Sequence, residues 1–173
     1  MLASTFRRIV TMDTADLLGQ FLLFLQTKAF RYCVIGGQAV NAYVEPLVSL
    51  DLDLVVALES AEEFSRMLAG SFEVEAFPHG INVSLIDSDL RIRVQTLPRY
   101  LPFIKRAKKR QVLGHAMYVA QIRDVLQGKI WAATDPEQRG STRQKDLADI
   151  SRILEAYPAL RRQVPESVLS RLI

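Results

Sequence analysis

Two aspartates, Asp51 and Asp53, stand two residues apart at the start of the apolar segment 50–58. Alternate residues of a β-strand project from the same face, so both carboxylates point the same way, about 7 Å apart. Carboxylates at that separation can hold one or two hard divalent cations. Without cations or hydrogen bonds to compensate them, two carboxylates in a strand of Leu and Val cost several kcal/mol. The spacing therefore favours a metal site.

A second feature, Gly36-Gly37, lies between a short β-rich segment at 31–35 and a helical segment at 38–44. Glycines before a helix N-terminus leave backbone N–H groups accessible, which suits a triphosphate. Each feature alone has a structural explanation, since a glycine pair often makes only a tight turn and Asp-x-Asp also occurs on surface edges. Together, at this spacing, they predict a phosphate cradle opposite a metal clamp.

The elements that position these residues are predicted from periodicity. A helix capped by Asp13 or Thr14 runs to about residue 28, and another follows Ser60, with Glu63 completing a capping box. Strand patterns cover 50–58, 72–77, 81–86 and 90–96, with a hairpin turn at 87–89. The pattern predicts an α/β (α+β) fold with a mixed sheet flanked by helices.

From about residue 98 the pattern becomes helical, and we expect one domain over 1–173 with a helical C-terminal portion at about 98–173. Helices are predicted at about 101–109, 122–134, 142–156 and from 166, and a short apolar segment at 117–120 is expected to pair at a sheet edge. The loop 135–141 is too short to mark a domain boundary.

Composition sets the class of protein. The 173 residues are 49% hydrophobic with a net charge of +3, which is typical of a globular chain with a real core. We expect no membrane helix and no secretory signal, hence a cytoplasmic protein. The single cysteine, Cys33, excludes an internal disulfide and is expected to be a buried small hydrophobe. His79 and His115 have no ligand-spaced partner, so structural or exposed histidines are favoured.

Five basic residues are concentrated in the segment 105–110. Such a run predicts a solvated helix face. The alternative is a surface that attracts phosphate or RNA. No aromatic residue is interleaved in the run to stack on bases, which weakens the prediction of single-stranded RNA binding.

Residues 34–43 (VIGGQAVNAY) followed by 51–56 (DLDLVV) resemble the bacterial nucleotidyltransferase superfamily, in particular its minimal and AbiEii-type toxin branches. Residues 124–133 (DVLQGKIWAA) and 143–150 (RQKDLADI) are similar to the C-terminal helices of that branch. The resemblance implies the nucleotidyltransferase fold and transfer of a nucleotidyl group from an NTP to a hydroxyl, with pyrophosphate leaving. The acceptor, a small molecule, tRNA or protein, stays open, and a cognate antitoxin is an expected partner of a toxin.

The resemblance also implies roles for residues. Asp51 and Asp53 would be catalytic ligands of Mg²⁺ or Mn²⁺ in a two-metal mechanism. The remaining expected contacts are to nucleotide or phosphate, from Gly36, Gly37, Ser49, Lys129, Arg143 and Lys145. Asp146 and Asp149 are expected to be structural and to pair with Arg143 or Lys145.

The sequence departs from the family at the third carboxylate, because Arg93 occupies its expected place on the neighbouring strand. A fixed cation there removes a ligand and repels a second metal ion, and we expect the Arg93 guanidinium to form an ion pair with Asp51 or Asp53. Leu47 replaces the basic residue that usually precedes the acidic pair. An alternative alignment makes Asp87 or Asp89 the third acid. Two hypotheses stay open, a nucleotidyltransferase and a degenerate, non-catalytic module that binds nucleotide or protein. A dinucleotide-dependent oxidoreductase is disfavoured, since its longer glycine fingerprint is missing.

Overall fold

The computed structural model describes residues 16–172. The predicted capping residues Asp13 and Thr14 lie outside this range. Within it, no helix has both the length and the apolar composition that crossing a membrane requires. Cys33 is buried, and this burial raises the pKa of its thiol to about 12.

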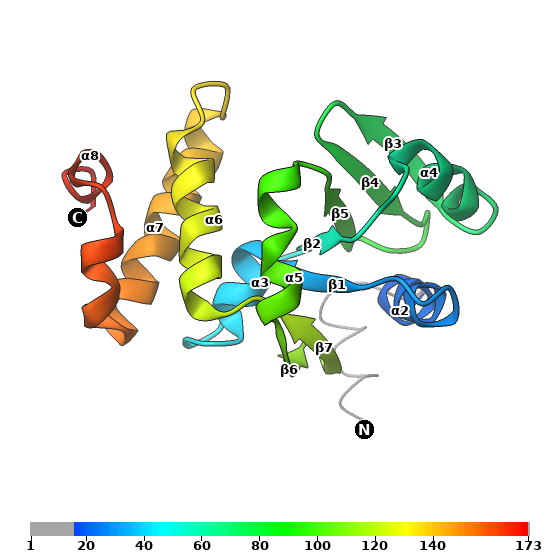
Figure 1. The fold of residues 1–173 in the computed structure, drawn as a ribbon, viewed down its shortest axis with the longest axis horizontal. Coiled ribbons are helices and arrows are strands. Elements are labelled where there is room, and N and C mark those ends of the chain that lie inside the picture. Colours follow the sequence, from blue (N-terminus) through cyan, green and yellow to red (C-terminus); the bar gives the residue numbers. More distant parts are fainter. Residues whose placement is uncertain (1–15, 173) are drawn as a thin grey trace.

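A seven-stranded mixed sheet forms the centre of the molecule, in the order β3-β4-β5-β2-β1-β7-β6 (Figure 1). The strands are β1 (Tyr32–Ile35), β2 (Asp51–Val56), β3 (Glu73–Phe77), β4 (Gly80–Ser84), β5 (Arg91–Gln95), β6 (Lys108–Val112) and β7 (His115–Val119). β2 runs antiparallel to β1 and parallel to β5, and β1 runs parallel to β7. The predicted mixed sheet is confirmed.

The α-helices are α2 (Leu17–Thr27), α3 (Gly36–Asn41), α4 (Ala61–Ala69), α5 (Pro102–Arg106), α6 (Ile122–Thr134), α7 (Gly140–Ala156) and α8 (Glu166–Leu169). Two 3-10 helices are η1 (Pro98–Tyr100) and η2 (Pro158–Gln163). In Figure 1, α6, α7 and α8 gather at one end of the molecule, and α4 lies at the other end beside β3, β4 and β5. The predicted cap of α4 is confirmed, since the Glu63 N–H donates to Ser60 Oγ at 3.1 Å.

The core is built on the alternation of β2. Leu52 and Leu54 are fully buried, while Asp51 and Asp53 project from the other face of the strand. α2 meets α4 through aromatic rings, as in the edge-to-face contact of Phe24 with Phe64 at 5.8 Å. The sequence-predicted alternation around the two carboxylates is therefore confirmed.

The predicted helix over 101–109 is wrong in its second half. α5 ends at Arg106, and Lys108–Val112 forms the edge strand β6, which pairs antiparallel with β7. The basic run thus lies mostly on a sheet edge and not on one helix face. The predicted edge segment at 117–120 is indeed a strand, β7, but it lies inside the sheet between β1 and β6.

Candidate functional site

The acidic pair and the glycine turn lie at the same rim of the sheet. Ile35 of β1 is in register with Asp53 of β2, and Gly36 follows Ile35 directly. β5 flanks β2 on the other side. The prediction that these three strands lie side by side, with glycines and carboxylates at one rim, is confirmed.

Gly36 is held in contact with the Asp53 carboxylate. Its φ is +70°, in the left-handed region that favours glycine, and a Cβ built on it would lie 2.5 Å from Asp53 Oδ2. Gly37 has more room, because the nearest atom to a Cβ there would be Asp149 Oδ2 at 3.8 Å. The turn therefore fixes the position of one carboxylate and leaves the backbone of the next residue accessible.

Ser49 braces the entry to β2. Its Oγ accepts a hydrogen bond from the Asp51 N–H at 3.2 Å, and its carbonyl accepts one from the buried Gln38 side chain at 3.0 Å. Both bonds hold the loop that delivers Asp51 to the rim. A phosphate-binding role for the Ser49 hydroxyl stays a prediction.

Two arginines of β5 face the two aspartates of β2. Asp51 is in register with Arg91 and Asp53 with Arg93. Arg91 Nε lies 2.9 Å from Asp51 Oδ1, in an exposed ion pair. The prediction that Arg93 itself forms an ion pair with Asp51 or Asp53 is wrong, since within residues 16–172 no carboxylate lies within 4 Å of its side-chain nitrogens. Sequence reasoning missed Arg91, although its i, i+2 spacing from Arg93 places both arginines on one strand face.

The side chains around Asp51 and Asp53 do not suit the binding of two divalent metal ions, which a two-metal mechanism requires. Among the described residues, no three His, Cys, Asp or Glu side chains form a group suited to a metal ion. Asp87 and Asp89 therefore do not complete a triad with Asp51 and Asp53. With arginines beside both carboxylates, the donor set does not fit a second divalent cation.

A buried ion-pair network lies behind the glycine turn. Lys129 Nζ of α6 lies 2.9 Å from both Asp146 Oδ1 and Asp149 Oδ2 of α7. Arg152 contacts Asp149 Oδ1 at 2.8 Å, and it also donates to Asn41 Oδ1 at 2.9 Å and to the Glu45 carbonyl at 2.7 Å. The network thereby joins α6 and α7 to α3. Asp146 and Asp149 do have structural partners, but these are Lys129 and Arg152 and not Arg143 or Lys145.

Comparison with known proteins bears on the fold. No protein-family model matches the chain, and a search of curated proteins gave no match. Solved structures do match. The antibiotic-resistance factor ANT(2'')-Ia with adenylyl-2''-tobramycin is 13% identical, with TM-score 0.59 and coverage of 90% of this chain and 96% of that one. An antigenic nucleotidyltransferase-like protein from Paracoccidioides brasiliensis is 15% identical, with TM-score 0.53 and coverage of 99% and 95%. The lincomycin-bound lincosamide antibiotic adenylyltransferase LnuA is 10% identical, with TM-score 0.51 and coverage of 81% and 98%.

The chain has the nucleotidyltransferase fold. At these identities the likeness concerns the fold and leaves the AbiEii-type branch untested.

Burial raises the pKa of Asp53 from 3.8 to about 6. Lys129 and Arg93 lower this pKa, whereas Asp51 and Asp146 raise it. Burial also lowers the pKa of Lys129, but the carboxylates of Asp149 and Asp146 outweigh that effect, so the pKa lies above its usual value and the ammonium stays charged. The nucleotidyltransferase-fold rim thus combines a permanent buried cation with a carboxylate that is easily neutralised.

Two residues with a predicted phosphate contact have other surroundings. Arg143 donates to the carbonyls of Asp135 and Gln138 at 2.9 and 3.0 Å, which closes the loop before α7. Lys145 is exposed on α7 and forms no ion pair with any residue in the described range. Their roles toward nucleotide stay predictions, as does that of Lys129, whose ammonium already bridges two carboxylates.

Proposed function

We propose that this protein binds a nucleoside triphosphate at the rim formed by Gly36, Gly37 and Asp53, and that nucleotidyl transfer there is slow or absent. One observation carries the proposal, namely that Arg93 stands in register beside Asp53 where a complete site has a third carboxylate. The protein is then a degenerate nucleotidyltransferase-fold module that has kept a nucleotide site.

Charge supports this function. A triphosphate is attracted by arginine, and Arg93 is exposed at the rim with no ion-pair partner in the described part of the chain. The backbone N–H groups of the glycine turn supply further donors. Because α3 has only six residues, its dipole adds little, and the arginine is the main attraction. One neighbour is named an adenylyltransferase and another is in complex with an adenylylated antibiotic, which favours an adenine nucleotide as the ligand to test first.

The metal belongs to the same proposal. Asp51 and Asp53 hold at most one Mg²⁺ or Mn²⁺, weakly, and more tightly when phosphate oxygens add ligands. Nucleotide binding should therefore depend less on Mg²⁺ than it does in a site with three carboxylates.

An active nucleotidyltransferase is the second candidate. It is favoured by the contact between Gly36 and Asp53 and by the charged Lys129, whose field lowers the pKa of that carboxyl. Its acceptor hydroxyl would belong to a small molecule, a tRNA or a protein. A bacterial, cytoplasmic toxin of the AbiEii type, held by an antitoxin, belongs to this second proposal and rests on the sequence resemblance.

Calorimetry with ATP, in Mg²⁺ and in EDTA, tests the proposal. We expect wild type to bind in both buffers, Arg93→Ala to lose about tenfold or more in affinity, and the matched variant Arg66→Ala, which removes an exposed arginine of α4, to bind normally. The proposal would be refuted if EDTA abolished ATP binding while Arg93→Ala left the affinity unchanged.

A transfer assay decides between the two candidates. α-labelled ATP is incubated with a mixture of small-molecule, tRNA and protein acceptors. If wild type labels an acceptor rapidly and Arg93→Asp does not, the protein is an enzyme and Arg93 is a catalytic residue.

A further inference from the structure

The most unevenly charged part of the chain runs from β5 to the start of α6. Between Asp89 and Asp124 there is no Asp or Glu, while nine Lys and Arg residues occur there. Part of this segment is the β6–β7 hairpin, whose strand β6 is the outermost of the sheet. Its Lys108, Lys109 and Arg110 are all exposed. Lysines on an edge strand are expected as protection against edge-to-edge pairing, so the charge alone identifies no ligand.

An exposed tyrosine beside these cations points to a ligand. Tyr118 of β7 is 43% exposed and stands in register with Lys109. Lys109 Nζ lies 5.4 Å from the centre of the Tyr118 ring. The ring of Tyr32 on β1 supports the Tyr118 ring edge-on at 5.7 Å. The fold therefore supplies an aromatic ring next to the basic run, although none is interleaved in the run itself.

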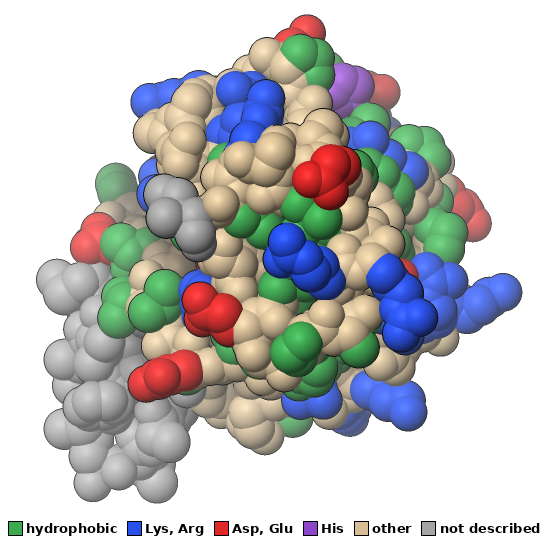
Figure 2. Space-filling view, turned by 90° about the vertical axis from the view of Figure 1, so that its left-hand side faces the viewer, with side chains coloured by type: hydrophobic (Ala, Val, Ile, Leu, Met, Phe, Trp, Pro, Cys, Tyr) green, Lys and Arg blue, Asp and Glu red, His purple; other side chains and the backbone are tan. Residues whose placement is uncertain are grey.

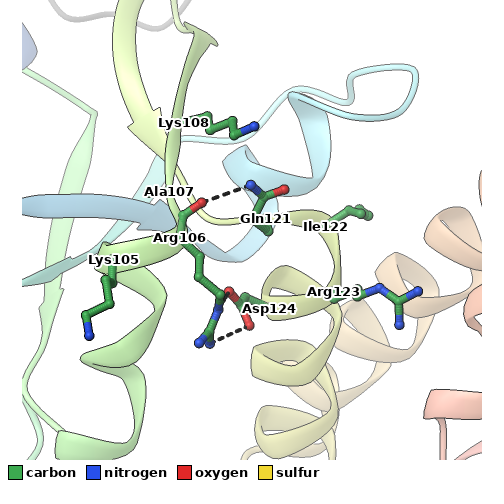
Figure 3. A pocket seen from close by; sticks show the side chains of 8 residues that line it. All are labelled: Lys105, Arg106, Ala107, Lys108, Gln121, Ile122, Arg123 and Asp124. Carbon is green, nitrogen blue, oxygen red and sulfur yellow. Dashed lines mark hydrogen bonds and ion pairs between the residues drawn. The ribbon is translucent and has the colours of Figure 1, made fainter.

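Around the same edge lies a pocket of about 530 Å³ between the end of α5 and the start of α6. Lys105, Lys108 and Arg123 line it, together with Arg106, which Asp124 already neutralises through two hydrogen bonds of 2.8 and 2.9 Å. Figure 3 shows that Lys105 and Arg123 stand at opposite sides of the pocket and do not converge on one point. Divergent cations suit a row of phosphates better than a single phosphate group.

Further cations continue beyond the pocket. The Gln163 side chain of η2 donates to the Arg123 carbonyl at 2.8 Å, and the same 3-10 helix carries the exposed Arg161 and Arg162. Figure 2 looks onto the end of the molecule where α7 and α8 lie, and its largest group of basic side chains stands at the right-hand margin. The positive charge thus extends over more than one element.

We propose that single-stranded nucleic acid binds round the edge strand β6, with a base stacked on Tyr118 beside Lys109 on one face of the sheet and phosphates on Lys108 and the adjoining pocket on the other face. A phosphodiester chain offers the regularly spaced anions that the divergent cations require. Base stacking explains an exposed tyrosine within a basic surface, which an acidic protein partner does not require. This surface is separate from the Gly36–Asp53 rim, so the proposal goes beyond the binding of a nucleoside triphosphate.

Fluorescence anisotropy with a labelled 20-nucleotide oligouridine tests this surface. We expect Lys108→Ala/Lys109→Ala to weaken binding at least tenfold and to reduce the slope of log affinity against log salt by about 1.4. The control Lys28→Ala/Arg139→Ala removes two exposed cations from other elements, and it should bind as wild type does. Thermal melting will check that both double variants are folded.

The tyrosine distinguishes base stacking from charge attraction. Tyr118→Ala should weaken binding about 5- to 100-fold, whereas Tyr118→Phe should retain it. Equal affinity of the two double variants would overturn the proposal. A Tyr118→Ala variant that binds the oligonucleotide as wild type does would also overturn the proposal. A poly-glutamate peptide that competes as well as unlabelled RNA would overturn it too, and would identify a surface for acidic proteins.

Discussion

Replacing Gly36 by alanine tests the link between the turn and the acidic pair. At a φ of +70°, a non-glycine residue is strained by about 1–2 kcal/mol. The new Cβ would also stand 2.5 Å from Asp53 Oδ2, so either the carboxylate or the turn must move, at a cost of about 1–3 kcal/mol. Alanine recovers about 0.4–1 kcal/mol through the unfolded state. We expect a net loss of about 2–3 kcal/mol in the free energy of unfolding.

The neighbouring glycine provides the matched control. At Gly37 the nearest atom to an added Cβ lies at 3.8 Å, which is ordinary van der Waals contact, and the position is helical. Gly37→Ala should therefore leave stability unchanged or raise it by up to about 1 kcal/mol. It should still weaken ATP binding if phosphate oxygens approach the backbone at this turn.

Thermal unfolding followed by circular dichroism, with ATP calorimetry on the same samples, measures both effects. For a chain of this size the melting temperature should fall by about 4–12 °C for Gly36→Ala and stay near the wild-type value for Gly37→Ala. Equal melting temperatures for the two variants would refute the close approach of Asp53 to the turn.

Other perturbations of the rim have equally definite outcomes. In EDTA, the protonated form of Asp53 stabilises the fold below pH 3.8, and this contribution is lost as pH rises through its folded pKa of about 6. Asp53→Asn should therefore be more stable than wild type by about 3 kcal/mol at pH 7.5 and by less at pH 5, as urea titrations at both values will test. Lys129→Met leaves the buried Asp146 carboxylate without an ion-pair partner among the described residues and leaves Asp149 with Arg152 alone, so it should cost about 3–5 kcal/mol in the same assay, against little change for the exposed Lys145→Met. In calorimetry, Mg²⁺ should bind Arg93→Asp more tightly than wild type. A lower Mg²⁺ affinity of the variant would contradict the placement of Arg93 at the third-carboxylate position.

The strand, turn, helix and strand around the rim were predictable because the signals are local. Alternation placed Asp51 and Asp53 on one face, and the glycine pair marked the first turn of α3. The position of Arg93 on the strand beside Asp53 followed from the resemblance to the nucleotidyltransferase superfamily, and the register of β2 with β5 agrees with it. What the sequence did not reveal is that Arg91 forms the actual ion pair, since both arginines satisfy the same periodicity.

The β6–β7 hairpin was missed for a specific physical reason. Its two-residue turn is Leu113-Gly114, with φ values of +49° and +80°, as a type I′ turn requires. The first position of such a turn usually carries Asn, Asp or Gly, and a leucine there hides the signal. The bonds between Lys129, Asp146 and Asp149 were missed for another reason, because they depend on the packing of α6 against α7 and not on local sequence.

The buried Lys129 network has a consequence for how this chain is made. During synthesis the strands β1, β2 and β5 and the helix α6 leave the ribosome before α7 does. Until Asp146 and Asp149 follow, the Lys129 ammonium has neither of its carboxylates, and enclosing it in the core would cost several kcal/mol. Arg152, which ties α7 to Asn41 of α3, arrives later still. The rim behind the glycine turn can therefore close around Lys129 only after α7 has been translated.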